Sequence, residues 1–551
     1  MEMLSRRSVW EGVQFLALHP VHFLCNILVV LLTLLLALLV KRRVFMLSLV
    51  STIWLGLAIA NFILLGYRTT PLAAIDFYIL KPVFSILKIY LTPVQTILIV
   101  LAFAAVITGI VFIFIKAPKH QALFRGALVS IAMTSLATFG LIHFSIQADA
   151  TSTSFANLAN AYRNYGFAYC FATSLLDTGI SKPKDYSAEA MVSLAEDIER
   201  ESEEEVSSSD QQGSPADPAQ SQQAPNVIMV QLESFIDPNR LEGFTYSENP
   251  VPVFTELKEN YTSGYLSVPA IGAGTANTEF EVLSGMNLDY FAAGEFPYNT
   301  ILKDTSCETV CFNLKELGYT ATAVHNYTGT FYGRNPVYAQ LGFDRFVPQE
   351  YMNGLTYNAL GWARDSVLVS ETMQALTTTP GRDFVFTVTV QSHGKYPAEG
   401  EKVEGDIAVL SAPEAVDKTA LTYYVNELSQ VDAFIGALIK ELEDFDEPTV
   451  LVLYGDHLPA LNIEADELAT DDLYQTTYVL WNNFGLDMQG GDLQAFQLSA
   501  YVLGQLNIHS GILTRFHQNF APDCEEEDYL SFLRVLEYDM LYGDHNIYAG
   551  D

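Results

Sequence analysis

The chain has 551 residues, half of them hydrophobic, and a formal net charge of −35. It is too long for one ordinary domain. Its acidity argues against nucleic-acid binding, which needs a basic face for the phosphates, and against a peripheral domain held to anionic lipid.

The first 149 residues predict an α-helical transmembrane domain. A helix needs about 20 apolar residues to cross the core of a bilayer. Four uncharged runs of about this length are residues 21–40, 44–66, 94–115 and 127–147.

Basic residues follow the first and the third of these runs. They are Lys41, Arg42, Arg43, Lys116, Lys119 and Arg125. Positively charged loops stay in the cytoplasm, so the fourth span is expected to end outside the cell. The acidic remainder of the chain is therefore predicted to be extracellular.

Residues 150–188 are expected to form a helical connector, and residues 189–225 a disordered acidic and polar tether. The tether is predicted from composition, because "ERESEEEVSSSDQQGSPADPAQSQQAP" has too few large apolar residues to offset chain entropy by burial. The five cysteines show no paired spacing and so indicate no disulfide framework. Cys307 and Cys311 are expected to be buried neighbours on a helix.

Residues 226–520 predict an α/β domain with a largely parallel central sheet, and residues 521–551 a C-terminal tail. Helical stretches such as residues 305–317 and 418–442 alternate with short β-rich runs, which are "NVIMVQLESF", "YTATAVHNY", "DFVFTVTVQSH", "TVLVLYGDH" and "TTYVLWNN". This alternation is typical of layered α/β proteins. In such sheets ligands bind beyond the C-terminal ends of the strands.

Acidic or histidine side chains end four of the predicted strands. They are Glu233, His325, His393 and the pair Asp456 and His457. Taken singly, each is more typical of a surface or capping residue. Together they are ligands suited to Mn²⁺, Mg²⁺ or Zn²⁺, so the pattern predicts a divalent cation site at this edge of the sheet.

Thr275, in "GAGTANTEF", is the candidate nucleophile. A helix N-cap is the simpler interpretation, since a threonine hydroxyl can accept hydrogen bonds from the first free N–H groups. Next to a bound cation the same hydroxyl has a lowered pKa and can attack a substrate. Arg334 and His393 are candidates for holding a phosphoryl group and balancing its charge.

Five motifs in a fixed order resemble the extracellular domain of lipoteichoic acid synthases, within the alkaline phosphatase and sulfatase superfamily. They are "NVIMVQLESF", "GAGTANTEF", "HNYTGTFYGRN", "SHGKYP" and "YGDHLP". The resemblance covers residues 226 to about 510 and implies a sulfatase-like fold. It implies that the metal ligands are Glu233, Thr275, Asp456 and His457, with Thr275 also the nucleophile.

The same resemblance implies a substrate pocket in which Arg334 and His393 surround the phosphate or glycerol, with His325 nearby. Two positions depart from the best-known members, because Tyr332 and Tyr327 stand where those proteins have a Trp and an Asp. The family also commonly has five spans, so this chain resembles that layout without its first helix.

The function implied is that of a membrane-anchored phosphoglycerol transferase in the cell membrane of a Gram-positive-type bacterium. It would move glycerol phosphate from phosphatidylglycerol, through a phosphothreonine, to a lipoteichoic-acid-type glycerophosphate polymer or a glycolipid. The expected cofactor is one Mn²⁺ or Mg²⁺ ion, with Zn²⁺ as an alternative. No nucleic acid is expected as a partner.

Two other functions stay open. A phosphoethanolamine or other phospho-headgroup transferase would use the same threonine and metal. A non-catalytic membrane sensor would only bind a ligand in the pocket. A true sulfatase is disfavoured, because the Cys or Ser with C/S-x-P-x-R spacing is absent and Thr275 takes its place.

Overall fold

The structure is a computed structural model. It describes residues 1–66, 70–77, 93–121, 124–148, 151, 158–176, 179–209, 224–292, 294–522 and 524–549. The chain divides into two compact units, and each is described here by itself. The first contains Met1–Gly179 and Phe291–Glu295, and the second contains Ile180–Tyr290 and Phe296–Asp551.

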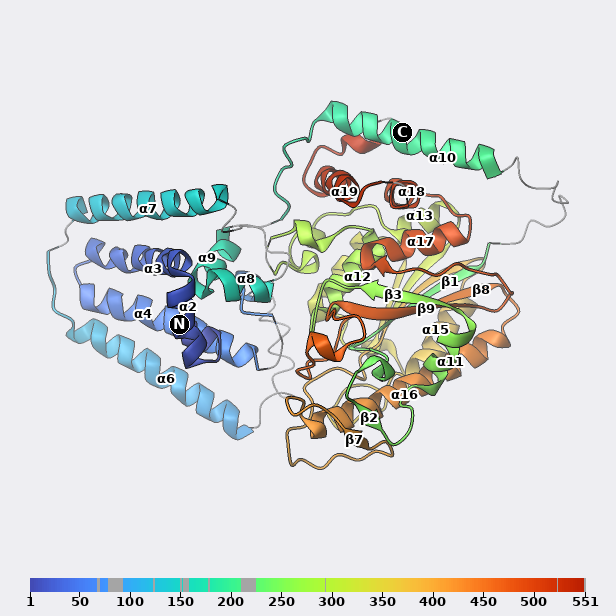
Figure 1. Ribbon diagram of the computed structural model, residues 1–551, viewed down its shortest axis with the longest axis horizontal. Helices are drawn as coiled ribbons and strands as arrows, with labels where there is room; N and C mark the ends of the chain where they lie inside the picture. Colours follow the sequence, from blue (N-terminus) through green and yellow to red (C-terminus); the bar gives the residue numbers. More distant parts are fainter. Residues whose placement is uncertain are drawn as a thin grey trace. The chain divides into compact units, whose positions relative to one another are not determined.

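The first unit is helical (Figure 1). Its helices are α1 (Glu2–Ser5), α2 (Val9–Leu18), α3 (Pro20–Leu35, continued by η1 Leu36–Leu39), α4 (Arg43–Leu64), α6 (Pro93–Lys116), α7 (Phe124–Gln147), α8 (Leu158–Tyr165) and α9 (Phe167–Leu176). By length and composition, four segments can cross a membrane: Pro20–Leu39, Arg43–Leu64, Val94–Lys116 and Phe124–Gln147. They coincide with the four predicted spans.

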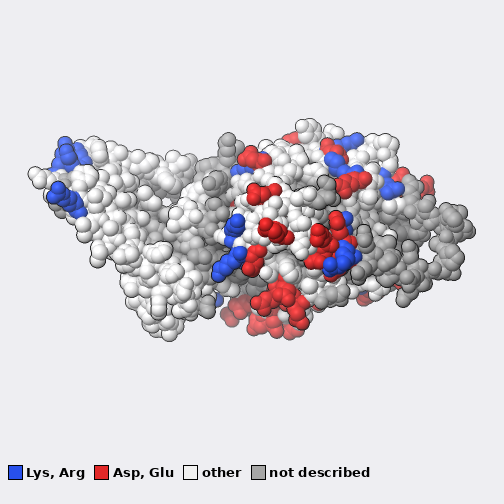
Figure 2. Space-filling model, turned by 90° about the horizontal axis from the view of Figure 1, so that it is seen from above, with Lys and Arg blue, Asp and Glu red and all other residues white. Residues whose placement is uncertain are grey.

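The two basic loops of this unit lie side by side. The N–H of His120, between α6 and α7, donates to the carbonyl of Lys41, between α3 and α4, over 2.8 Å. Arg43 donates from Nη2 to the carbonyl of Gln121 over 2.6 Å. Figure 2 shows Lys and Arg gathered at one end of the helical unit, whose surface is otherwise almost uncharged on the face drawn. Both loops at this end of the four long helices are therefore basic, while Arg7 lies at the opposite end, where its Nη1 donates to the Leu65 carbonyl over 3.1 Å.

The second unit is built on an eight-stranded sheet with strand order β10-β3-β9-β8-β1-β6-β4-β5. The strands are β1 (Asn226–Leu232), β3 (Thr262–Ser267), β4 (Thr320–His325), β5 (Arg345–Pro348), β6 (Asp383–Val388), β8 (Thr449–Gly455), β9 (Gln475–Asn482) and β10 (Leu493–Gln494). Neighbouring strands run parallel except where β9 pairs with β8 and β3. The largely parallel sheet is confirmed. A separate small sheet pairs β2 (Thr245–Tyr246) with β7 (Val409–Ser411).

Helices cover both faces of the large sheet (Figure 1). One face carries α11 (Pro252–Asn260), α15 (Val367–Thr377) and α16 (Lys418–Glu443), and the other carries α12 (Thr275–Ser284), α17 (Leu498–Gln505) and α18 (Ile512–Phe520). Because both faces are covered, every residue of β1 and β8 is buried. These two central strands end next to each other, at the edge where the candidate site lies.

The prediction of a disordered tether over residues 189–225 is wrong for its first half, which forms helix α10 (Ala188–Ser209). Met191, Leu194 and Ile198 are buried on one face of it, at the spacing of three and four residues that a helix requires. Composition alone missed these three residues among many charged ones. Residues 210–223 of the predicted tether lie outside the described residues.

The predicted boundary at residue 520 is also wrong, because the C-terminal segment belongs to the second unit. It forms helix α19 (Glu526–Leu541). Tyr186 donates from its hydroxyl to Asp539 Oδ1 over 2.6 Å and so ties this helix to the segment before α10. The α/β unit therefore extends beyond the predicted catalytic domain at both ends.

Candidate active site

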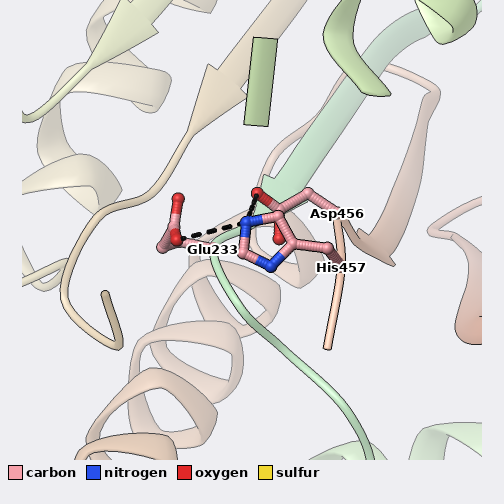
Figure 3. A group of neighbouring side chains, drawn as sticks. All are labelled: Glu233, Asp456 and His457. Carbon is pink, nitrogen blue, oxygen red and sulfur yellow. Dashed lines mark ion pairs between the residues drawn. The ribbon is translucent and has the colours of Figure 1, made fainter. Parts of the chain in front are cut away.

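Three of the predicted ligands meet at the C-terminal ends of β1 and β8. Glu233 follows β1, and Asp456 and His457 follow β8. The Nε2 atom of His457 lies 3.7 Å from Glu233 Oε1 and 3.5 Å from Asp456 Oδ2. All three side chains are buried and converge on one point (Figure 3). One ligand atom from each lies within 4.8 Å of the others, which is a spacing that can hold a metal ion.

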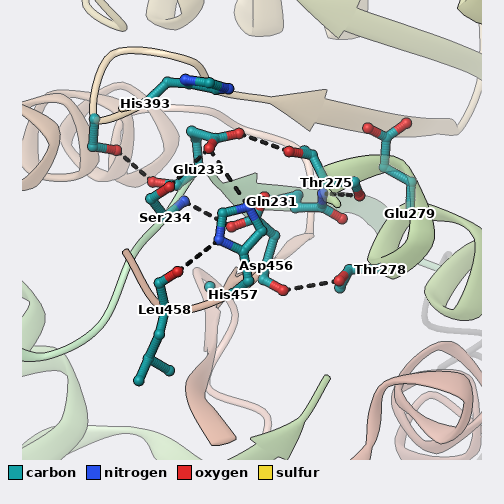
Figure 4. Close-up of polar contacts among 12 residues, drawn as sticks. Gln231, Glu233, Ser234, Thr275, Thr278, Glu279, His393, Asp456, His457 and Leu458 are labelled. Atoms are coloured by element: carbon teal, nitrogen blue, oxygen red, sulfur yellow. Dashed lines mark hydrogen bonds and ion pairs between the residues drawn. The ribbon is translucent and has the colours of Figure 1, made fainter. Parts of the chain in front are cut away.

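Thr275 joins this group from the first turn of α12 (Figure 4). Gly274 is the N-cap, with the left-handed φ of 114° that favours glycine. Thr275 is therefore the first helical residue, and its hydroxyl donates to Glu233 Oε2 over 2.9 Å. The simpler interpretation of Thr275 as a capping residue is wrong, because its hydroxyl faces the carboxylate and not the helix N–H groups.

Hydrogen bonds within the core of the unit lock the turn that carries Thr275. Gln231 donates from Nε2 to the Thr275 carbonyl over 3.0 Å. Thr278 donates from Oγ1 to the Asp456 carbonyl over 2.8 Å, and so couples α12 to the end of β8. The hydroxyl of Thr275 is thereby held on a rigid element and not on a loose loop.

The chemistry of the three side chains fits a divalent cation. Asp456 Oδ2 and His457 Nε2 are buried and have no hydrogen-bond partner among the described residues. The Nδ1 atom of His457 lies 2.9 Å from the Leu458 carbonyl, so it carries the proton and leaves the Nε2 lone pair available to a cation. Carboxylate and imidazole ligands suit Mn²⁺, Mg²⁺ and Zn²⁺.

Burial and the close spacing of Glu233, Asp456 and His457 shift the pKa values of these side chains. Burial acts to raise the pKa of Glu233, but the rings of His393 and His457 outweigh it and lower that pKa. Burial, with the charge of Glu233 added, raises the pKa of Asp456 well above its usual value. Burial also lowers the pKa of His457, which keeps its imidazole neutral. Two carboxylates this close favour a bound cation or a shared proton.

Arg334 lies in a buried ion pair. Its Nε lies 3.1 Å from Glu279 Oε1, its Nη2 also bonds to that oxygen, and the Tyr338 hydroxyl donates to Glu279 Oε2 over 2.7 Å. Burial works against the charge of Arg334, but Glu279 outweighs it and raises the pKa. Only Nη1 lacks a partner among the described residues, so at most one corner of the guanidinium is available to a substrate.

The two other predicted histidines end the neighbouring strands. His325, at the end of β4, has Nδ1 2.9 Å from the Val388 carbonyl, and its Nε2 has no partner among the described residues. Burial, reinforced by Arg334, lowers the pKa of His325 well below its usual value. His393 is half-buried and lies against the Trp362 ring, with centroids 4.4 Å apart. Figure 4 shows His393 on the same side of the candidate site as Glu233.

Sequence reasoning missed a buried clamp that ties the strand ends together. Asp365 accepts at Oδ1 from Asn326 Nδ2 over 2.8 Å, from the Val390 N–H over 3.1 Å and from the Gln391 N–H over 3.2 Å. It thereby joins the residue after His325 to the segment that leads to His393. Nothing local in "GWARDSV" distinguishes this carboxylate, because its partners come from two distant strands.

The clamp makes stability depend on pH. Burial raises the pKa of Asp365 from 3.8 to about 7, so the folded chain holds this proton more tightly than the unfolded chain does. Stability should therefore fall as pH rises from about 4 to about 7, and the penalty is complete above that range. Asp365→Asn cannot ionise and keeps the Oδ1 acceptor, so its melting temperature should fall less between pH 5 and pH 8.

This prediction is checked by melting curves of the full chain in detergent. Asp432 also has a raised pKa, of about 6. It is present in both proteins, so it contributes equally to the change of melting temperature with pH in each. If the melting temperatures of wild type and Asp365→Asn change with pH to the same extent, Asp365 does not titrate in this range.

The comparisons with known proteins place this geometry in a family. Residues 225–503 match the sulfatase family model, and this segment is just over half of the chain. The chain therefore belongs to the sulfatase family. The resemblance that the five motifs indicate is confirmed at this level.

Curated relatives show which proteins the chain is similar to. A putative cyclic β-1,2-glucan modification protein of Rhizobium meliloti is 29% identical over 380 residues, which are 64% of this chain and 54% of the relative. Lipoteichoic acid synthase 2 of Bacillus subtilis is 25% identical over 240 residues, 42% of this chain and 35% of the relative. The chain spans about half the length of these relatives or less.

Two solved structures share the fold. Streptococcus pyogenes phosphoglycerol transferase GacH, in complex with sn-glycerol-1-phosphate, superposes with a TM-score of 0.56 at 21% identity, over 68% of this chain and 98% of that one. The lipooligosaccharide phosphoethanolamine transferase EptA of Neisseria meningitidis gives 0.51 at 14% identity, over 89% and 97%. The second likeness extends over the N-terminal helices, so the two-part architecture is shared as well.

Proposed function

We propose that this protein is a membrane-anchored phosphotransferase that moves glycerol phosphate from phosphatidylglycerol to an acceptor hydroxyl. The observation that carries the proposal is the position of Thr275. Its hydroxyl is buried, lies on a rigid helix start and faces Glu233 within the cluster of candidate metal ligands. The likeness to two phospho-headgroup transferases, one of them for glycerol phosphate, supports the choice of reaction.

The chain's own residues then have distinct tasks. Glu233, Asp456 and His457 would hold one divalent cation, which when bound lowers the pKa of a hydroxyl and screens phosphate charge. Glu233 Oε2 accepts the hydrogen bond of the Thr275 hydroxyl and so aligns Oγ1 for attack. The Nη1 of Arg334 is a buried donor without a partner among the described residues. The Nδ1 of His325 faces the Val388 carbonyl and carries the proton, so its unpartnered Nε2 is an acceptor. We assign Arg334 to the phosphate oxygens and His325 to a hydroxyl of the glycerol.

The proposed reaction has two displacements. In the first, Oγ1 of Thr275 loses its proton and bonds to phosphorus, the bond to the diacylglycerol oxygen breaks, and that oxygen takes up a proton as diacylglycerol leaves. In the second, an acceptor hydroxyl loses its proton and bonds to phosphorus, the bond to Thr275 breaks, and Oγ1 of Thr275 takes up a proton again. Covalent catalysis of this kind divides one difficult step into two easier ones. We assign the proton donor for diacylglycerol to His393, which is half-buried.

The membrane orientation follows from the same proposal. The basic end of the four long helices would face the cytoplasm. Helix α7 starts at this end and finishes at the opposite one, so the α/β unit that follows would lie outside the cell. Phosphatidylglycerol would then be reached in the outer leaflet of the membrane.

The acceptor and the headgroup are tested together. The purified full chain in detergent is incubated with labelled phosphatidylglycerol or phosphatidylethanolamine and with a glycerophosphate oligomer, a glycolipid or a β-1,2-glucan as acceptor. The glucan is included because one relative is named for the modification of such a glucan. We expect diacylglycerol from phosphatidylglycerol and label on one acceptor. Faster turnover of phosphatidylethanolamine would favour the phosphoethanolamine transferase, and no turnover of either lipid would favour a sensor.

Metal removal provides an independent test. Chelation should abolish diacylglycerol release, since the buried carboxylates and imidazole cannot screen a phosphate without a cation. Added Mn²⁺ or Mg²⁺ should restore the activity, and Zn²⁺ serves as the comparison. Elemental analysis of the chelated protein is the control. Full activity with no bound metal would rule out the proposed centre.

A further inference from the structure

Ser234, which directly follows Glu233, contacts both candidate carboxylate ligands at once (Figure 4). Its hydroxyl donates to Glu233 Oε1 over 2.8 Å, and its backbone N–H donates to Asp456 Oδ1 over 2.7 Å. The residue is only 3% exposed. One residue therefore bridges ligands that come from two different strands, β1 and β8.

The backbone of Ser234 adopts an unusual conformation to make these two contacts. Its φ of 49° lies in the left-handed region, which residues other than glycine seldom occupy and which marks functional sites when surrounding contacts hold it. Such a contact is present, because the Tyr424 hydroxyl donates to the Ser234 carbonyl over 2.6 Å. The turn directs the N–H toward β8 while the hydroxyl reaches back to Glu233.

Residues of the adjoining segments keep this turn close to the end of β8. A Cβ atom on Gly455, the residue before Asp456, would lie 2.0 Å from the Phe235 carbonyl oxygen, so only glycine permits the approach. The Glu233 N–H donates to Thr389 Oγ1 over 2.8 Å, and the Ser392 hydroxyl donates to the Glu233 carbonyl. The backbone on both sides of Ser234 is thus fixed.

We infer that Ser234 is a positioning residue that fixes the orientation of the two carboxylates beside His457 and thereby sets the affinity of the metal centre. It engages one oxygen of each carboxylate, Glu233 Oε1 and Asp456 Oδ1. Asp456 Oδ2 has no partner among the described residues and lies 3.5 Å from His457 Nε2, while Glu233 Oε1 lies 3.7 Å from the same nitrogen and Glu233 Oε2 faces Thr275. Without the Ser234 hydroxyl the Glu233 carboxylate could rotate out of this arrangement, whereas the backbone N–H would still hold Asp456. The inference rests on the metal centre of the proposed function.

The test measures Mn²⁺ affinity and does not depend on turnover. Isothermal titration of the purified, metal-free full chain in detergent compares wild type with Ser234→Ala and Ser234→Gly. Loss of an outer-shell hydrogen bond to a metal ligand weakens binding by about 10- to 100-fold, and we expect this loss in both variants. The spectrum of bound Mn²⁺ in electron paramagnetic resonance should change as well, because the ligand oxygens are rearranged.

Two further comparisons separate positioning from a general loss of structure. Glycine tolerates a positive φ at no steric cost, so Ser234→Gly should melt no lower than wild type and still bind Mn²⁺ weakly. Ser284→Ala is the matched control, since this buried serine on α12 donates to the Phe280 carbonyl over 2.6 Å, away from the ligands. It should leave the Mn²⁺ affinity unchanged.

The outcomes distinguish the inference from the function on which it rests. Equal Mn²⁺ affinity in wild type and both Ser234 variants would overturn the role of Ser234 alone. A wild type that binds no divalent cation would overturn the role and the proposed centre together. Weaker binding in the variants, with no lipid turnover by wild type, would support Ser234 and overturn the proposed transferase.

Discussion

Replacing Thr275 by alanine is expected to lower release of diacylglycerol by at least about 1,000-fold, which corresponds to about 4 kcal/mol of activation free energy. The reason is that Thr275 supplies the only side-chain oxygen of the protein that is proposed to bond to phosphorus. The hydroxyl donates a hydrogen bond to Glu233 Oε2, and alanine suits a helix better than threonine does. The melting temperature should therefore change little.

Two variants make this test specific. Thr275→Ser keeps the hydroxyl and should retain a measurable fraction of the activity, while its extra rotational freedom lowers the rate. Mass spectrometry after incubation with phosphatidylglycerol should find phosphoglycerol on residue 275 of the wild type and none on the alanine variant. Activity of Thr275→Ala within about tenfold of wild type, a difference of only about 1.4 kcal/mol, would contradict the assignment.

The second large effect is expected on stability, from Glu279→Gln. Removing one partner of a buried ion pair leaves the other charge uncompensated and costs about 3–5 kcal/mol. Arg334 and Glu279 are each at most 1% exposed as side chains, so solvent screens neither charge. Melting of the full chain in detergent should shift down by several degrees. Activity should fall too, since an uncompensated Arg334 no longer holds its Nη1 at the site.

A double variant separates the two consequences. Glu279→Gln with Arg334→Met removes both charges and still offers the Tyr338 hydroxyl an acceptor, so most of the stability should return. The activity should stay low, because the guanidinium is gone. A Glu279→Gln variant as stable as wild type would show that the pair does not hold this part of the fold. Full activity in the double variant would exclude Arg334 from substrate binding.

Several features followed from local sequence. The four spans are readable because a membrane helix must be apolar along its whole length, so no partner is needed to identify it. The parallel sheet is readable because buried strands alternate with helices in order. The edge that carries Glu233, Asp456 and His457 follows from the same reasoning, since parallel strands end on one side of the sheet.

Other predictions failed where distant contacts decide the structure. Helix α10 depends on Met191, Leu194 and Ile198 meeting the rest of the α/β unit, and composition cannot show that a docking surface exists. The role of Arg334 changed in the same way. Arg334 and Glu279 lie 55 positions apart. The residues around Arg334 therefore do not show whether its guanidinium is free or paired with a carboxylate.

The sequence by itself determined the architecture, the sulfatase relationship and the cluster of candidate ligands, because each depends on residue type and order along the chain. Only the tertiary structure showed that Thr275 faces Glu233 and does not cap its helix, that Asp365 joins two strand ends, and that Ser234 bridges two carboxylates. Each of these is a hydrogen bond between segments far apart in the chain or a backbone angle that such bonds impose. Directional contacts of that kind are set by packing and leave no local pattern.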